Sequence, residues 1–254
     1  MPFSLLLQPL CGLLVALALP PRPAEATGAA SPARPGPPAG LRLRVEPVFG
    51  SQPLVLETQT YPTAHNGAVS LSTCRFYLSA LRLTFTDGSS YAEPASYHLI
   101  DAADTATFSL TLPQAPGKAI KMLTFSVGVD SAANVAGAQG GDLEPGRGMY
   151  WAWHSGYVNA KLEGRSPACP GPRHEFEWHV GGYQRPCASL RRVTLPVPPG
   201  HPATAPLRVL ADVGQWLSTR RLAETASVLV PGPAAQALAD GYATMFRLAP
   251  ATQP

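Results

Sequence analysis

The stretch GMYWAWHSGYVNAKLEG at residues 148–164 is the densest group of redox-capable and metal-binding side chains in this sequence. Two tryptophans, two tyrosines, a methionine and a histidine fall within nine consecutive positions. The rings of Trp151 and Trp153 are electron-rich, and the imidazole of His154 is a ligand type that suits copper or zinc. Because aromatic residues in strands usually pack inside, the simplest structural interpretation places both tryptophans in the core of a β-sandwich.

The six histidines form a second set of candidates. Four of them, His98, His154, His174 and His179, lie in or beside segments with strand-like alternation. Alternation turns His179 away from the apolar row of its own strand, and it does the same for His154 if no bulge intervenes. A single imidazole of this kind is more often a surface or hydrogen-bonded group than a ligand. Two or three that converge from different strands would form a copper or zinc site.

The sequence gives little indication of enzymatic or calcium-binding chemistry. The signatures of common enzymes, G-x-S-x-G, the P-loop, H-E-x-x-H and C-x-x-C, are absent from the sequence, and we expect no enzymatic activity. The Gly-rich segment 128–148 offers Asp130, Asn134, Asp142 and Glu144 as oxygen ligands, but their spacing matches no calcium loop. A tight structural loop is therefore the favoured interpretation of this segment.

The N-terminal region has the features of an export signal. An uncharged apolar run, LLLQPLCGLLVALALP, is followed by the small-x-small sequence Ala24-Glu25-Ala26, which predicts a secretory signal peptide over residues 1–26. The Pro/Gly-rich segment 27–40 predicts a disordered linker, and the folded domain is expected over residues 41–250. We expect no membrane span after signal cleavage. The formal net charge of +3 is too small to suggest a nucleic-acid partner.

Three cysteines follow the signal segment. In an oxidising compartment two of them are expected to pair, and Cys169 with Cys187 is the favoured disulfide. The strand-like segment between them could let a hairpin bring its ends together. Cys74 is then left as a buried thiol.

Period-two alternation recurs over residues 41–195 and is interrupted by Gly, Pro and Asp clusters. After Pro198, residues 207–217 suggest a strand that runs into a helix, and residues 232–246 have apolar side chains at helical spacing. These patterns predict an all-β fold, an antiparallel β-sandwich of about eight or nine strands with one or two short C-terminal helices. The main predicted strands are 41–49, 68–85, 96–101, 107–112, 118–130, 149–164 with a bulge or bend at Ser155-Gly156, 174–182 and 191–197.

The long run FSVGVDSAANVAGAQGGDLEPGRGMYWAWHSGYVNAKLEG resembles the MbnP-like family of periplasmic copper-binding proteins, which occur beside methanobactin genes. The segments RFYLSALRLTFTDGSSY, YHLIDAAD, FEWHVGGY and LADGYATMF look like further blocks of that family in the same order. The resemblance extends over about residues 41–248. It implies a secreted β-sandwich that binds copper through histidine.

The resemblance also implies a partner, a di-haem cytochrome c peroxidase-like protein (MbnH-like), which in some relatives oxidises a tryptophan to kynurenine. By motif, the implied copper ligands are His98 of YHLID and His179 of FEWHVGG. Relatives with kynurenine have the modified tryptophan two residues before a liganding histidine, whereas here Ala152 stands two residues before His154. The full set of candidate site residues is, for copper, His98, His179, His154 and His65 and, for oxidation, Trp151 or Trp153.

The sequence therefore suggests a periplasmic or secreted protein that stores, buffers or delivers copper and is not itself an enzyme. Two alternatives remain open. One is a secreted β-sandwich that binds carbohydrate or protein on an aromatic platform without metal. The other is a copper site with an open coordination position that performs redox chemistry.

Overall fold

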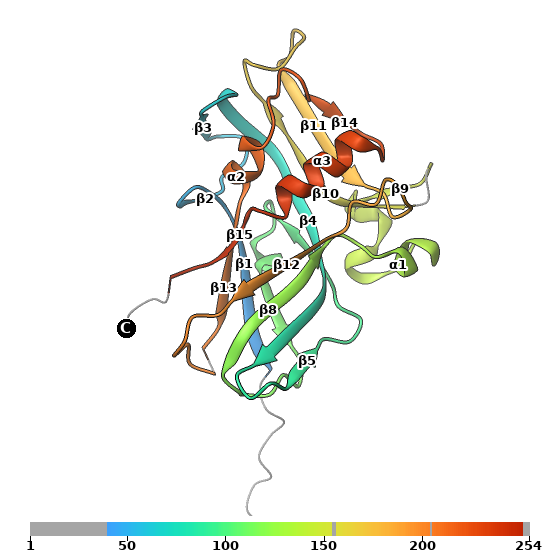
Figure 1. Ribbon diagram of the computed structural model, residues 1–254. Helices are drawn as coiled ribbons and strands as arrows, with labels where there is room; N and C mark the ends of the chain where they lie inside the picture. The colour runs from blue at the N-terminus through green and yellow to red at the C-terminus, as the bar shows by residue number, and fades with distance from the viewer. Residues whose placement is uncertain (1–39, 154–155, 204, 251–254) are drawn as a thin grey trace, which may run out of the picture. The chain divides into compact units, whose positions relative to one another are not determined.

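Figure 1 shows the computed structural model, which describes residues 40–153, 156–203 and 205–250. The strands in these ranges form a five-stranded sheet and a ten-stranded sheet. Apolar side chains from both sheets enclose one large core, so the expected all-β sandwich is confirmed. Both sheets are mixed rather than purely antiparallel, because each contains one parallel pair of strands.

The smaller sheet has the order β15-β13-β1-β2, and β7 also pairs with β1. Its central strand follows the predicted alternation, since Leu43 and Val45 are buried while Arg44 and Glu46 are partly accessible. Glu46 accepts a hydrogen bond of 2.7 Å from Arg208 on the neighbouring strand. The strands are β1 (Leu41–Phe49), β2 (Gln52–Pro53), β7 (Ser109–Leu112), β13 (Leu207–Asp212) and β15 (Phe246–Leu248).

The larger sheet has the order β12-β8-β4-β10-β11-β14. The strands β3, β5 and β6 also pair with β4, and β9 pairs with β10. A bulge at Ala80, with a φ of 52°, shifts the register of β4, so that Leu78 before it and Leu81 after it both enter the core. The strands are β3 (Thr60–Thr63), β4 (Gly67–Phe85), β5 (Ser90–Ala92), β6 (Tyr97–Asp101), β8 (Ile120–Val127), β9 (Tyr150–Trp151), β10 (Gly156–Arg165), β11 (Glu175–Gly181), β12 (Arg191–Pro196) and β14 (Ser227–Val228).

Two short helices near the C-terminus complete the core, as the sequence predicts. Helix α2 (Val213–Ser218) begins at Asp212, whose carboxylate accepts hydrogen bonds from the first backbone N–H groups of the helix. Helix α3 (Pro233–Tyr242) packs against α2 and β11, and the rings of Trp216 and Tyr242 meet at 5.6 Å in an edge arrangement. Both rings are fully buried, so the two helices cover part of the inner face of the larger sheet.

The opposite face of the larger sheet, here called the outer face, carries the segment 128–151. This segment contains α1 (Ser131–Val135) and the single turns η2 (Gly141–Leu143) and η3 (Pro145–Arg147). Its apolar residues form a second, smaller cluster with Tyr77, Tyr157 and Val158 of the sheet. Asp130 caps α1, and Asn134 accepts a hydrogen bond of 2.8 Å from the N–H of Tyr157. These internal contacts agree with the prediction of a tight structural loop.

The structure contradicts the expected disulfide between Cys169 and Cys187, because both are free thiols. Cys169 lies before β11, where its carbonyl is 3.1 Å from His174 Nδ1, whereas Cys187 contacts Gly182 directly after β11. The seven residues of β11 span roughly 20 Å, and a disulfide requires Cα atoms within about 7 Å. The segment between the cysteines is one extended strand rather than a closed hairpin. Cys74 is buried and free, as expected.

The predicted signal segment 1–26 and nearly all of the predicted linker 27–40 lie outside the described residues, so these boundaries stay predictions. Strand β1 begins at Leu41, which is the predicted start of the folded domain. Within residues 40–153, 156–203 and 205–250, no helix has the length and apolar character needed to cross a bilayer.

A buried asparagine connects the loop on the outer face to the sheet. Asn159 accepts a hydrogen bond of 2.9 Å from the N–H of Val129 and donates one of 2.8 Å to Ser189. We expect Asn159→Ala to lower the free energy of unfolding by about 2 kcal/mol, because it leaves a buried N–H unsatisfied. Urea unfolding measures this loss. Thr124→Ala, which removes an exposed hydroxyl contact, is the control and should change stability by less than about 0.5 kcal/mol. Equal losses of unfolding free energy in the two variants would contradict the stabilising role of the Asn159 hydrogen bonds.

Candidate functional site

A row of polar side chains crosses the outer face of the larger sheet. The strand register makes His179 of β11 the neighbour of Lys161 on β10 and makes Lys161 the neighbour of Arg75 on β4. Asp101 of β6 continues the row beyond Arg75. Paired residues of adjacent strands point to the same face of a sheet. The register therefore places four side chains that can be charged beside one another.

His179 is held by a carboxylate on the next strand. Its Nε2 lies 2.6 Å from Oε1 of Glu163, and the hydroxyl of Thr73 donates a hydrogen bond of 2.7 Å to Oε2 of the same carboxylate. The hydrogen bond from His179 lowers the pKa of Glu163 to about 2, and the hydroxyl of Thr73 acts in the same direction against the effect of burial. Since an ionised carboxylate only accepts hydrogen bonds, Nε2 carries the proton in this pair.

The neighbouring cations join this row to the loop on the outer face. Lys161 Nζ donates a hydrogen bond of 2.7 Å to the carbonyl of Gly148, and an Arg75 guanidinium nitrogen donates one of 3.0 Å to the carbonyl of Arg147. Arg75 Nε also lies 2.8 Å from a carboxylate oxygen of Asp101. Burial lowers the pKa of Lys161. The two cations therefore hold the end of the loop against the sheet directly before β9.

The tryptophans lie on the same face as His179. The indole of Trp151 packs so closely on Gly181 that a Cβ there would be 2.5 Å from the ring. Gly181 lies two residues beyond His179 in β11, roughly 7 Å along the strand. The rings of Trp151 and Trp153 have centroids 5.6 Å apart. Trp151 is buried in the second cluster, as expected, but Trp153 is 65% exposed, so its expected place in the core is wrong.

His98 lies on the opposite face of the larger sheet from His179. It is the register neighbour of Leu78, whose side chain enters the main core, and therefore points to the inner face. Its Nε2 lies 2.8 Å from a carboxylate oxygen of Glu93. Strands β6 and β11 are separated by β4 and β10, which is about 14 Å across the sheet. A metal ion holds its nitrogen ligands about 2 Å away, so one ion cannot join His98 and His179 in this arrangement.

The other two histidine candidates are placed differently. His65 is exposed in the turn between β3 and β4, beyond the N-terminal end of β4, and Arg75 lies roughly 25 Å further along that strand, near its middle. His154 lies outside the described residues, between β9 and β10. Within the described ranges, no three His, Cys, Asp or Glu side chains form a group that could hold a metal ion. The assignments of His65 and His154 as ligands therefore stay predictions.

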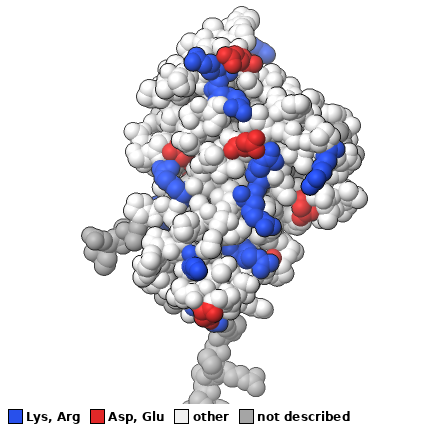
Figure 2. All heavy atoms as spheres, viewed as in Figure 1, with Lys and Arg blue, Asp and Glu red and all other residues white. Residues whose placement is uncertain are grey.

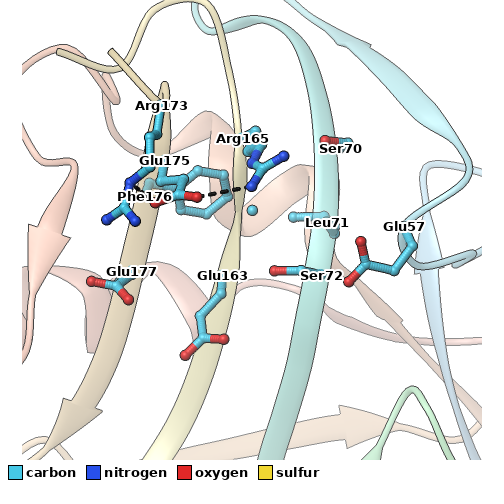
Figure 3. Close-up of a pocket in the computed structure, with 11 residues that line it drawn as sticks. Glu57, Ser70, Leu71, Ser72, Glu163, Arg165, Arg173, Glu175, Phe176 and Glu177 are labelled. Atoms are coloured by element: carbon cyan, nitrogen blue, oxygen red, sulfur yellow. Dashed lines mark hydrogen bonds and ion pairs between the residues drawn. The ribbon is translucent and has the colours of Figure 1, made fainter. Parts of the chain in front are cut away.

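Sequence reasoning missed the carboxylates of this face. Glu163 and Glu177 are register neighbours that occupy alternate positions of the same strands as Lys161 and His179, and this shared alternation is the signal that could have identified them. Figure 3 shows both carboxylates at one end of a groove of about 410 Å³, with Arg165 at the other end. The groove is lined by Glu57, Ser70, Leu71, Ser72, Glu163, Gly164, Arg165, Arg173, Glu175, Phe176 and Glu177.

Charges of both signs are mixed on the described surface. Arg165 and Arg173 each lie 2.9 Å from a carboxylate oxygen of Glu175 at the end of the groove. Figure 2 shows basic and acidic side chains interspersed on the face that it presents. Such a distribution favours local contacts over long-range electrostatic steering of a partner.

The fold and the site together define a class: a mixed-sheet β-sandwich with a histidine–carboxylate pair and two tryptophans on one sheet face. The family model described as MbnP matches residues 38–231, and the chain belongs to the MbnP family. A solved structure described as MbnP from Methylosinus trichosporium is similar with a TM-score of 0.51 and 17% sequence identity, over 78% of this chain and 86% of that chain. This likeness shows the shared fold. A search of curated proteins gives no match.

The low pKa of Glu163 predicts a pH dependence of stability. The pKa falls from its usual 4.5 to about 2 on folding, so the stabilisation by the ionised carboxylate is complete above pH 4.5 and is lost as the pH falls towards 2. We expect the stability difference between the wild type and Glu163→Gln to shrink over this range in urea unfolding. Glu177→Gln, the same change on the adjoining strand, is the control, because it leaves the hydrogen bonds of Glu163 to His179 and Thr73 in place. If the stability difference between the wild type and Glu163→Gln does not vary with pH, the lowered pKa of Glu163 is contradicted.

Proposed function

We propose that this protein is a periplasmic or secreted copper-binding protein that stores, buffers or delivers copper and is not an enzyme itself. Membership of the MbnP family supports this proposal. The structural observation that carries it is the imidazole of His179, which is oriented by Glu163 on the same sheet face as Trp151. The copper site is therefore expected on the outer face of the larger sheet.

The chemistry of His179 fits a copper ligand. Its Nε2 is bound to Glu163, and its Nδ1 makes no hydrogen bond to any described residue. A metal-binding histidine almost always donates its other ring N–H to a carboxylate, a carbonyl or water, and His179 has this arrangement. Imidazole nitrogen suits both copper and zinc, and divalent copper binds more strongly at a generic nitrogen site. His179 would hold copper through Nδ1, with His154 as the next expected ligand.

The tryptophans support the proposal of a redox partner. The exposed ring of Trp153 lies 5.6 Å from the buried ring of Trp151, and the rings of Tyr150 and Tyr157 lie 4.9 Å apart beside them. A di-haem cytochrome c peroxidase-like protein that docks over Trp153 could remove electrons from these rings at short range. Either tryptophan is then a candidate for oxidation.

The structure gives less support to the alternative of a carbohydrate-binding or protein-binding module. Such a module would combine the polar groove with an aromatic platform. The groove lies at the Glu175 end of β11, whereas Trp151 packs at the Gly181 end of the same strand. The groove and the aromatic rings therefore lie toward different ends of this strand.

Matched substitutions test the position of the copper site. His179→Gln and His98→Gln both keep a side-chain donor for the adjoining carboxylate, but glutamine lacks the imidazole nitrogen. We expect His179→Gln to weaken copper binding by more than about 100-fold, because even loss of an outer partner of a ligand costs 10- to 100-fold. His98→Gln should bind copper like the wild type. Chelator competition with purified protein measures both affinities. The reverse result would place the site on the inner face, and a wild type without copper affinity would contradict the proposed function.

A further inference from the structure

We infer that Glu163 is a positioning residue that fixes the tautomer of His179, so that Nδ1 rather than Nε2 keeps the lone pair that binds the metal. This inference rests on the proposed copper function. It assigns the ligating atom, and it assigns a role to two residues, Glu163 and Thr73, that sequence reasoning did not identify.

The geometry around the carboxylate carries the argument. Oε1 of Glu163 lies 2.6 Å from His179 Nε2, and Oε2 lies 2.7 Å from the hydroxyl of Thr73. Each oxygen therefore has a partner on a different neighbouring strand, β11 on one side and β4 on the other. The His179 side chain is 18% exposed and that of Glu163 is 26% exposed, so both are largely shielded from water. The carboxylate cannot rotate without losing one of these two bonds.

A fixed carboxylate selects one tautomer of the neutral imidazole. Neutral imidazole has one ring N–H and one nitrogen with an exposed lone pair. With the proton on Nε2, the ring donates to the carboxylate and the lone pair of Nδ1 is available for a metal. With the proton on Nδ1, the lone pair of Nε2 would face a negatively charged oxygen and the hydrogen bond would be lost. The first tautomer is therefore strongly favoured before any metal binds.

A second histidine–carboxylate pair, His98 and Glu93, lies on the other face of the sheet. His98 Nε2 lies 2.8 Å from Glu93, and the hydroxyl of Ser96 donates a hydrogen bond of 2.5 Å to the same carboxylate oxygen. This group repeats the hydroxyl–carboxylate–imidazole order of Thr73, Glu163 and His179. It provides a control in which the same substitution acts on a histidine outside the proposed site.

The direct test is the ¹⁵N NMR spectrum of the imidazoles in the metal-free protein at a pH where they are neutral. We expect His179 to show a protonated Nε2 and an unprotonated Nδ1. In Glu163→Gln, whose amide can donate or accept, this preference should weaken, and copper affinity measured by chelator competition should fall 10- to 100-fold. Glu93→Gln should leave the His179 spectrum and copper affinity at their wild-type values.

Two results would overturn the inference: a protonated Nδ1 in wild-type His179, or a Glu163→Gln variant with unchanged copper affinity. If Glu163→Gln does not fold, Thr73→Val provides the second variant, because it frees only Oε2 and should give a smaller loss of affinity in the same direction. An unchanged affinity in Thr73→Val would then count against the role of the hydroxyl in fixing the carboxylate. The NMR measurement needs no copper, so a wild-type protein with the expected tautomer but no copper affinity would contradict the proposed function alone.

Discussion

The two-residue alternation of the ten-stranded sheet is the constraint on which the rest of the structure depends. Along β11, Trp178 enters the main core while His179 points to the opposite face, and the same division holds on β10 and β4. The bulge at Ala80 preserves this division along the 19 residues of β4. The inner face can therefore pack into the main hydrophobic core, while the outer face carries the polar row beside the smaller hydrophobic cluster.

The candidate site gains its rigidity from these strands. Thr73, Glu163 and His179 lie on three adjacent strands, so the hydrogen-bonded ladder fixes their backbones before their side chains interact. Sites built on strands hold their side chains more precisely than sites built on loops. The segment 128–151 adds Trp151, and Asn159 and Lys161 secure this segment to the sheet. Copper binding would then need little rearrangement of the strands.

Alternation within a strand could be predicted from the sequence, but the pairing between strands could not. The bounds of β1 and the orientation of His179 follow from local patterns and agree with the structure. The separation of His98 from His179 depends on the register of β6 against β4, which no local pattern reveals. The predicted disulfide between Cys169 and Cys187 was wrong for a similar reason. A strand between two cysteines separates them unless the chain reverses direction. The role of Glu163 was hidden because its partners lie on other strands.

Paramagnetic line broadening by divalent copper tests the central claim, that copper binds on the outer face at His179, most directly. The claim predicts that stoichiometric copper broadens the amide signals around His179 and Lys161 and the indole signal of Trp151 first in a ¹H–¹⁵N spectrum. The signals of Glu93 and His98, about three strand spacings away, should stay sharp at the same copper concentration. Broadening centred on His98, with the signals around His179 unchanged, would contradict the account.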